Sequence, residues 1–150
     1  MSKTISFRGQ LNMGLEDRIR LRTLQGKTGY KITKFQLMPS DPTNDNIEVI
    51  IQIWKTSAAA AGASATIDFS DNRMLAAGYI EDNAGDNVSF RTDLVIFDNE
   101  KFNQDIYISS VAPTATNAGT NYYIELEQMK LDLNEQTVAT LKDIRNTGSQ

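Results

Sequence analysis

Two groups of acidic residues are the first candidates for chemistry in this sequence. They are the pair Asp68 and Asp71 and the trio Glu81, Asp82 and Asp86. Two neighbouring carboxylates can act as general acid and general base, as they do in glycoside hydrolysis. Both groups also lie beside asparagine or glycine, where carboxylates commonly accept hydrogen bonds within turns. We therefore favour turn formation over catalysis for both groups.

The segment 82–87 also carries oxygen side chains of the kind that bind calcium, from Asp82, Asn83, Asp86 and Asn87. Their spacing does not match an EF-hand loop, and no glutamate stands at the twelfth position of such a loop. An Asx-rich turn explains the same residues. We expect no bound metal and no cofactor, with calcium at this loop kept as the alternative.

The sequence contains no histidine and no cysteine. Histidine is the usual general base near neutral pH, and the two residue types together supply most zinc ligands and the common nucleophilic triads. We therefore expect a non-enzymatic protein with no catalytic residues.

One turn imitates a phosphate-binding loop, at Gly26, Lys27 and Thr28. A P-loop requires a glycine five residues before Gly26, and this chain has Leu21 there. The alternating residues that follow predict a strand where a P-loop needs a helix. A hairpin turn is the better interpretation.

Aromatic residues suggest a second kind of site. Trp54, Tyr79, Tyr107, Tyr122 and Tyr123 can line a platform for sugars, although aromatic residues at strand positions more often belong to a core.

The charge is distributed unevenly along the chain. The net charge is −4, but residues 1–34 carry +6 and the remaining residues carry −10. Arg18, Arg20 and Arg22 alternate with Ile19 and Leu21, so a strand would present the three arginines together on the side opposite the core. We predict that this row binds an acidic surface on a protein partner. The alternatives are a solvated strand face and internal salt bridges.

Strict alternation of apolar and polar residues is the commonest pattern in the chain and indicates strands. About eight short strands separated by turns predict an all-β fold, namely a two-sheet antiparallel β-sandwich that is jelly-roll-like, in a single domain over residues 1–150. A short C-terminal helix is expected at about 134–145, where Val138, Leu141 and Ile144 form an apolar stripe.

Several local features are also expected. Ile47 to Lys55 should be the central strand, and a change of alternation near Thr33 predicts a bulge. Residues 56–65 are small and uncharged, which suits an exposed loop. A short strand at 66–69 and a helical turn through 71–76 should follow.

Four segments resemble small virion proteins of tailed phages, particularly phages of marine bacteria. They are Asp17 to Thr23 (DRIRLRT), Gly26 to Pro39 (GKTGYKITKFQLMP), Val95 to Ile108 (VIFDNEKFNQDIYI) and Asn121 to Leu133 (NYYIELEQMKLDL). The resemblance implies a β-sandwich that docks on a larger protein assembly, such as a capsid decoration or cement protein, without activity of its own.

The expected partners follow from this resemblance and from the composition. They are the major capsid protein or another virion protein, with several symmetric copies or a homo-oligomer. An acidic chain is repelled by nucleic acid and by anionic lipid, and no apolar run has the length of a signal peptide or membrane span. We expect a protein made in the host cytoplasm and located in the virion. Alternatives are a tail, neck or fibre-associated protein and a glycan-binding receptor module.

Overall fold

The computed structural model describes residues 3–12, 14–21, 27–41, 43, 46–57, 66–83, 88–97, 100–111, 119–132, 138–139 and 141. These residues form eight strands, which are β1 (Lys3–Leu11), β2 (Glu16–Ile19), β3 (Thr28–Pro39), β4 (Asn46–Trp54), β5 (Met74–Asn83), β6 (Val88–Ile96), β7 (Ile106–Val111) and β8 (Thr120–Lys130).

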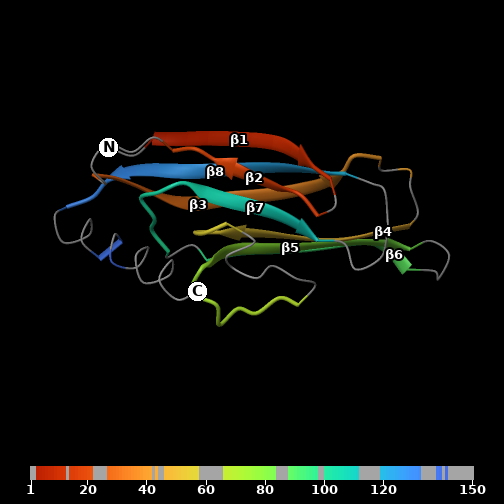
Figure 1. Cartoon of the computed structure of the whole chain (residues 1–150). Helices are drawn as coiled ribbons and strands as arrows, with labels where there is room; N and C mark the ends of the chain where they lie inside the picture. Colours follow the sequence, from red (N-terminus) through yellow and green to blue (C-terminus); the bar gives the residue numbers. More distant parts are fainter. Residues whose placement is uncertain are drawn as a thin grey trace.

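The strands form two antiparallel sheets (Figure 1). The smaller sheet has the order β1-β8-β3 and the larger has the order β2-β7-β4-β5-β6. The pairs β1 with β8, β2 with β7 and β4 with β5 are those a long hairpin makes when it folds over into a jelly roll. The fourth such pair, β3 and β6, is in contact without a ladder, and β6 pairs with β5 at the edge of the larger sheet. The predicted jelly-roll-like β-sandwich is confirmed.

The core lies between the two sheets, and β4 runs through its centre. Ile47, Val49, Ile51 and Ile53 on β4 are each no more than 2% exposed, and β5 and β7 flank this strand. The prediction of a central strand at 47–55 is therefore confirmed. The opposite side of β4 is buried as well, since Trp54 packs there with Met74 and Ala77.

The bulge predicted near Thr33 is also present. The pairing of β3 with β8 shifts register between Ile32 and Lys34, so Thr33 is the extra residue. The shift lets Ile32 and Phe35 both face the core although three positions separate them.

Residues 66–83 differ from the prediction. No strand forms at 66–69, and Met74 to Ala76 open β5 where a helical turn was expected. β5 pairs with β4 on one side and with β6 on the other, and Met74 and Leu75 are both buried. Pairing and burial on both faces override the helix propensity of methionine, leucine and alanine.

Two further predictions fall mostly on residues that the structure does not describe. Val138, Ala139 and Leu141 have helical backbone, and the rest of the helix expected at 134–145 lies outside the described residues. In the loop expected at 56–65, Thr56 is buried and Ser57 is half-buried, which differs from the predicted exposure. Residues 58–65 lie outside the described part.

Candidate functional site

The carboxylates of Asp68 and Asp71 serve as turn acceptors. Asp68 Oδ1 accepts hydrogen bonds from the Ser70 amide and hydroxyl, at 2.9 and 2.6 Å. Asp71 accepts the Arg73 amide at 3.0 Å and forms an ion pair with its guanidinium at 2.8 Å. These hydrogen bonds lower the pKa of both carboxyl groups below the ordinary value, whereas a general acid needs a raised pKa. The local geometry fits the turn interpretation.

Glu81 and Asp82 of the second acidic group lie at the end of β5. Glu81 faces Arg91 on β6, with 4.0 Å between the charged atoms. Asp82 is half-buried, and Asp86 and Asn87 of the calcium alternative lie outside the described residues. Within the described ranges, no three His, Cys, Asp or Glu side chains are grouped so that they could hold a metal ion.

The five aromatic residues considered as a sugar platform do not lie together. Trp54 is buried and its indole N–H donates to Ser109 Oγ at 3.1 Å, with Tyr107 packed against the same cluster. Tyr122 belongs to the core between the sheets, whereas Tyr123 is half-buried on the other side of β8. Trp54, Tyr107 and Tyr122 therefore form no common platform with Tyr123.

Tyr122 links the two sheets through its hydroxyl. The ring passes close to Gly9 on β1, where a Cβ atom would stand only 2.6 Å from Tyr122 Oη. The hydroxyl donates to Asp17 Oδ2 on β2 at 2.9 Å. Burial and this hydrogen bond raise the pKa of Tyr122 above its ordinary value. Gly9 thus leaves the space for a polar contact between the layers.

Stability should therefore fall on the alkaline side. Burial, with Glu48 and Glu81 nearby, also raises the pKa of Tyr79, to about 12. The folded state keeps the hydroxyl protons of Tyr79 and Tyr122 at a pH where the unfolded chain releases them. Their contribution to the free energy of unfolding is therefore complete below about pH 10 and is lost as the pH rises further. This loss of stability is measured by comparing the urea midpoints of wild type and Tyr122→Phe between about pH 9 and 11.5. The variant should lose less stability over this range, and equal losses would contradict the effect.

The predicted arginine row divides into residues with different surroundings. Arg18 lies on β2 and pairs with Asp105, at 2.8 Å from Nη2 to Oδ2, and its guanidinium lies 5.8 Å from the centre of the Tyr107 ring. Asp105 also accepts the Leu21 amide at 2.8 Å. Arg18 therefore has an internal salt bridge, one of the alternatives considered for this row.

Arg20 is exposed and has no ion-pair partner among the residues that the structure describes. Ile19 and Leu21 on either side of it are buried, as the alternation predicts. Arg22 lies outside the described residues. Nearby Leu15 is 55% exposed, although its backbone is fixed by hydrogen bonds to Asn12 and Ser110. We call Leu15, Arg18 and Arg20 the β2 surface.

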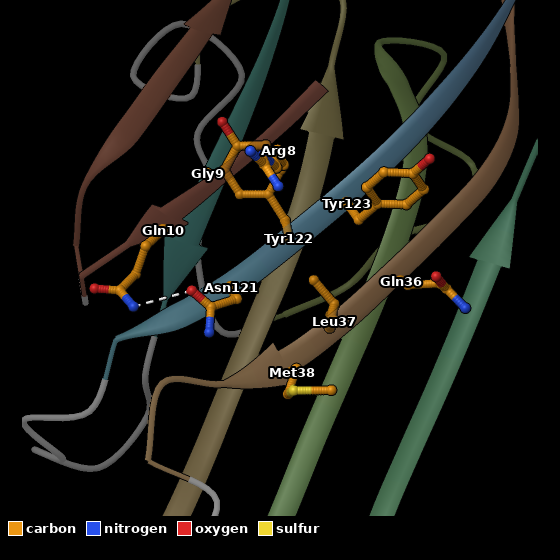
Figure 2. A pocket seen from close by; sticks show the side chains of 9 residues that line it. All are labelled: Arg8, Gly9, Gln10, Gln36, Leu37, Met38, Asn121, Tyr122 and Tyr123. Atoms are coloured by element: carbon orange, nitrogen blue, oxygen red, sulfur yellow. Dashed lines mark hydrogen bonds between the residues drawn. The ribbon is translucent and has the colours of Figure 1, made fainter. Parts of the chain in front are cut away.

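A groove of about 650 Å³ crosses the outer side of the smaller sheet (Figure 2). Three consecutive residues from each of β1, β3 and β8 line it, namely Arg8, Gly9, Gln10, Gln36, Leu37, Met38, Asn121, Tyr122 and Tyr123. The strand register sets two outward-facing rows across the sheet, one of Arg8, Tyr123 and Gln36 and one of Gln10, Asn121 and Met38. The row between them, Gly9, Tyr122 and Leu37, faces the core and contributes the floor.

Hydrogen bonds and charges order the side chains of this groove. Gln10 Nε2 donates to Asn121 Oδ1 at 2.9 Å, which joins the amides of β1 and β8 (Figure 2). The Tyr123 hydroxyl donates to Glu125 Oε1 at 2.9 Å, and this bond raises the pKa of Tyr123 above its ordinary value. The Lys34 ammonium lies 6.0 Å from the centre of the Tyr123 ring. The groove was not predicted from the sequence, because Gln10 and Asn121, whose side-chain amides join across it, are 111 residues apart.

Comparisons with protein-family models, with curated protein sequences and with solved structures find no match for this chain. No helix in the described ranges has the length and apolar character needed to span a membrane.

Proposed function

We propose that this chain is a non-enzymatic structural protein of a phage particle, and specifically a capsid decoration or cement protein that stabilises the assembled shell. Its partner is the major capsid protein, and it binds in many symmetric copies. It is made in the host cytoplasm and acts in the virion.

The resemblance of four segments to small virion proteins of tailed phages carries this proposal. Three of these segments include β2, β3 and β8, and the fourth runs from the end of β6 into β7. They thus fall on strands of both sheets and on the β2 surface. A β-sandwich with exposed side chains on its strands suits a binding protein, although the fold alone does not determine function.

The β2 surface has the chemistry of a docking patch. Arg20 supplies an exposed positive charge, and Leu15 supplies an exposed apolar side chain on a fixed backbone. Leu15 and Arg20 are five residues apart in the sequence, which corresponds to about 17 Å along an extended chain. Exposed ion pairs contribute only about 0–1 kcal/mol each, so the cations set orientation and association rate while apolar contacts add affinity. Many copies on a symmetric shell add avidity.

Reversing the charges at Arg20 and Arg22 tests this surface. We expect the double variant Arg20→Glu with Arg22→Glu to fold normally and to bind particles about tenfold more weakly, and wild-type binding to weaken with salt. Arg18 stays unchanged, because a glutamate there would face Asp105 and disturb β2. Occupancy is measured by incubating the purified protein with particles that lack it and quantifying the bound fraction.

The matched control is Arg91→Gln on β6, at the opposite edge of the same sheet, where the arginine side chain is 63% exposed and a glutamate would face Glu81. It changes the net charge in the same direction and should leave occupancy near that of wild type. If the double variant decorates particles as well as wild type does at every salt concentration, the docking role of Arg20 and Arg22 is wrong.

A further inference from the structure

The outer side of the smaller sheet carries one surplus positive charge beside the groove. Lys31 pairs with Glu127 at 3.6 Å, and Lys34 stands opposite Glu125 in the strand register. Arg8 has no ion-pair partner in the described part of the chain, and no acidic residue lines the groove. An unpaired guanidinium in a groove without acidic lining residues favours a ligand with a negative group.

The other polar groups in the groove are side-chain amides. Gln10, Gln36 and Asn121 each offer an N–H₂ donor and a carbonyl acceptor. A sugar hydroxyl also donates and accepts, so a neighbouring pair of amides can satisfy it in both directions. The bond between Gln10 and Asn121 holds two of these amides in position before a ligand arrives.

The groove also has an apolar component and a suitable size. The Tyr123 ring is half-buried, and Met38, which lies beside Asn121, is 61% exposed. The C–H groups on one face of a sugar ring are apolar and can pack against such side chains. A volume of about 650 Å³ lies within the usual range for small-ligand sites and accommodates about two or three sugar rings.

We propose that this groove binds a short oligosaccharide that carries a carboxylate. Arg8 binds the carboxylate, Gln10, Asn121 and Gln36 bind hydroxyl groups, and the Tyr123 ring packs against an apolar sugar face. This site goes beyond the docking function proposed above and is independent of the β2 surface.

Other ligand classes fit the groove less well. Nucleic acid needs several cations along its backbone, and Arg8 is the one cation among the lining residues. An added peptide strand needs unpaired backbone groups at a sheet edge, whereas this groove crosses β8, which is paired on both sides with β1 and β3.

The groove and the β2 surface belong to opposite layers of the sandwich. Arg8 lies between inward-facing Phe7 and Gly9 and points outward from the smaller sheet, whereas Arg18 points outward from the larger sheet. A copy that docks on a particle through the β2 surface can therefore keep its groove open to ligands.

The test uses the full chain and defined probes in solution. They are a galacturonic acid trimer, a mannuronic acid trimer and sialyllactose, with a neutral glucose trimer for comparison. We expect at least one acidic probe to bind about tenfold more tightly than the neutral trimer, measured by calorimetry. Amide NMR shifts on binding should map to Arg8, Gln36, Asn121 and Tyr123.

Arg8→Gln should lower the affinity for that acidic probe about tenfold, and Asn121→Ala should also weaken it. Arg20→Gln is the matched control, because it removes an exposed arginine from the opposite layer, and it should leave the affinity unchanged. Melting temperatures establish that each variant is folded. The proposal is overturned if no acidic probe binds, if the neutral trimer binds equally well, or if folded Arg8→Gln keeps the wild-type affinity.

Discussion

Replacing Ile51 with alanine should lower the free energy of unfolding by about 2–5 kcal/mol. Ile51 is fully buried at the centre of β4, where it lies opposite Gly78 on β5 and Ser110 on β7. Neither neighbour has a large side chain that could move into the space left by the isoleucine. The cavity should therefore persist, and its cost adds to the lost transfer free energy. Urea denaturation at neutral pH measures the change.

The control for this substitution is Leu15→Ala, since Leu15 is 55% exposed. It should change stability by no more than about 0.5 kcal/mol. If Ile51→Ala does not fold, Ile51→Val should still cost about 0.5–1.5 kcal/mol. A loss below about 1 kcal/mol for folded Ile51→Ala would contradict the central position of β4.

Replacing Gln52 with methionine should raise the free energy of unfolding by about 1–3 kcal/mol. Gln52 is fully buried on the other side of β4, and neither its amide nitrogen nor its amide oxygen has a hydrogen-bond partner. Its neighbours in the sheet are Ser109 on β7 and Ala77 on β5. Methionine has nearly the same shape and no group that requires a hydrogen bond, so the unmet desolvation cost disappears.

The same change at an exposed glutamine is the matched control. Gln36 is exposed on β3, and Gln36→Met should alter stability by no more than about 0.5 kcal/mol. If Gln52→Met is less stable than wild type, then the Gln52 amide has hydrogen-bond partners in solution, and the interpretation of an unsatisfied buried group is wrong.

The strands with clean alternation could be predicted from the sequence. One face of each was clearly apolar, as in β1 with Ile5 and Phe7 and in β4 with its stripe of isoleucine and valine. Even the bulge at Thr33 was visible, because burying both Ile32 and Phe35 requires a change of phase. In these segments the local pattern and the final environment agree.

β5 could not be predicted in the same way. Met74 to Ala77 are all buried, so no alternation marks a strand, and their residue types favour a helix in isolation. In the last strand, the alternation of apolar residues changes phase between Leu126 and Met129. β8 keeps a continuous register with β1 from Thr120 to Gln128, and buried Leu131 lies just beyond the end of the strand.

The surfaces depended on pairings that a sequence does not display. The alternation placed Arg18 and Arg20 outward from the core, but only the pairing of β2 with β7 shows that Asp105 lies beside Arg18. The groove likewise requires β1 and β3 to flank β8. Its residues taken singly are ordinary outward-facing strand positions, and their chemistry emerges only when three distant segments lie together.

One cryo-EM reconstruction of the parent particle tests the proposed function most directly. The proposal predicts density for this eight-stranded sandwich on the outside of the capsid shell, in a copy number set by capsid symmetry. The β2 surface should contact the shell, with the groove on the smaller sheet facing away from it. Density for the sandwich only in the tail, neck or fibres, or no such density anywhere on the particle, would contradict a decoration role.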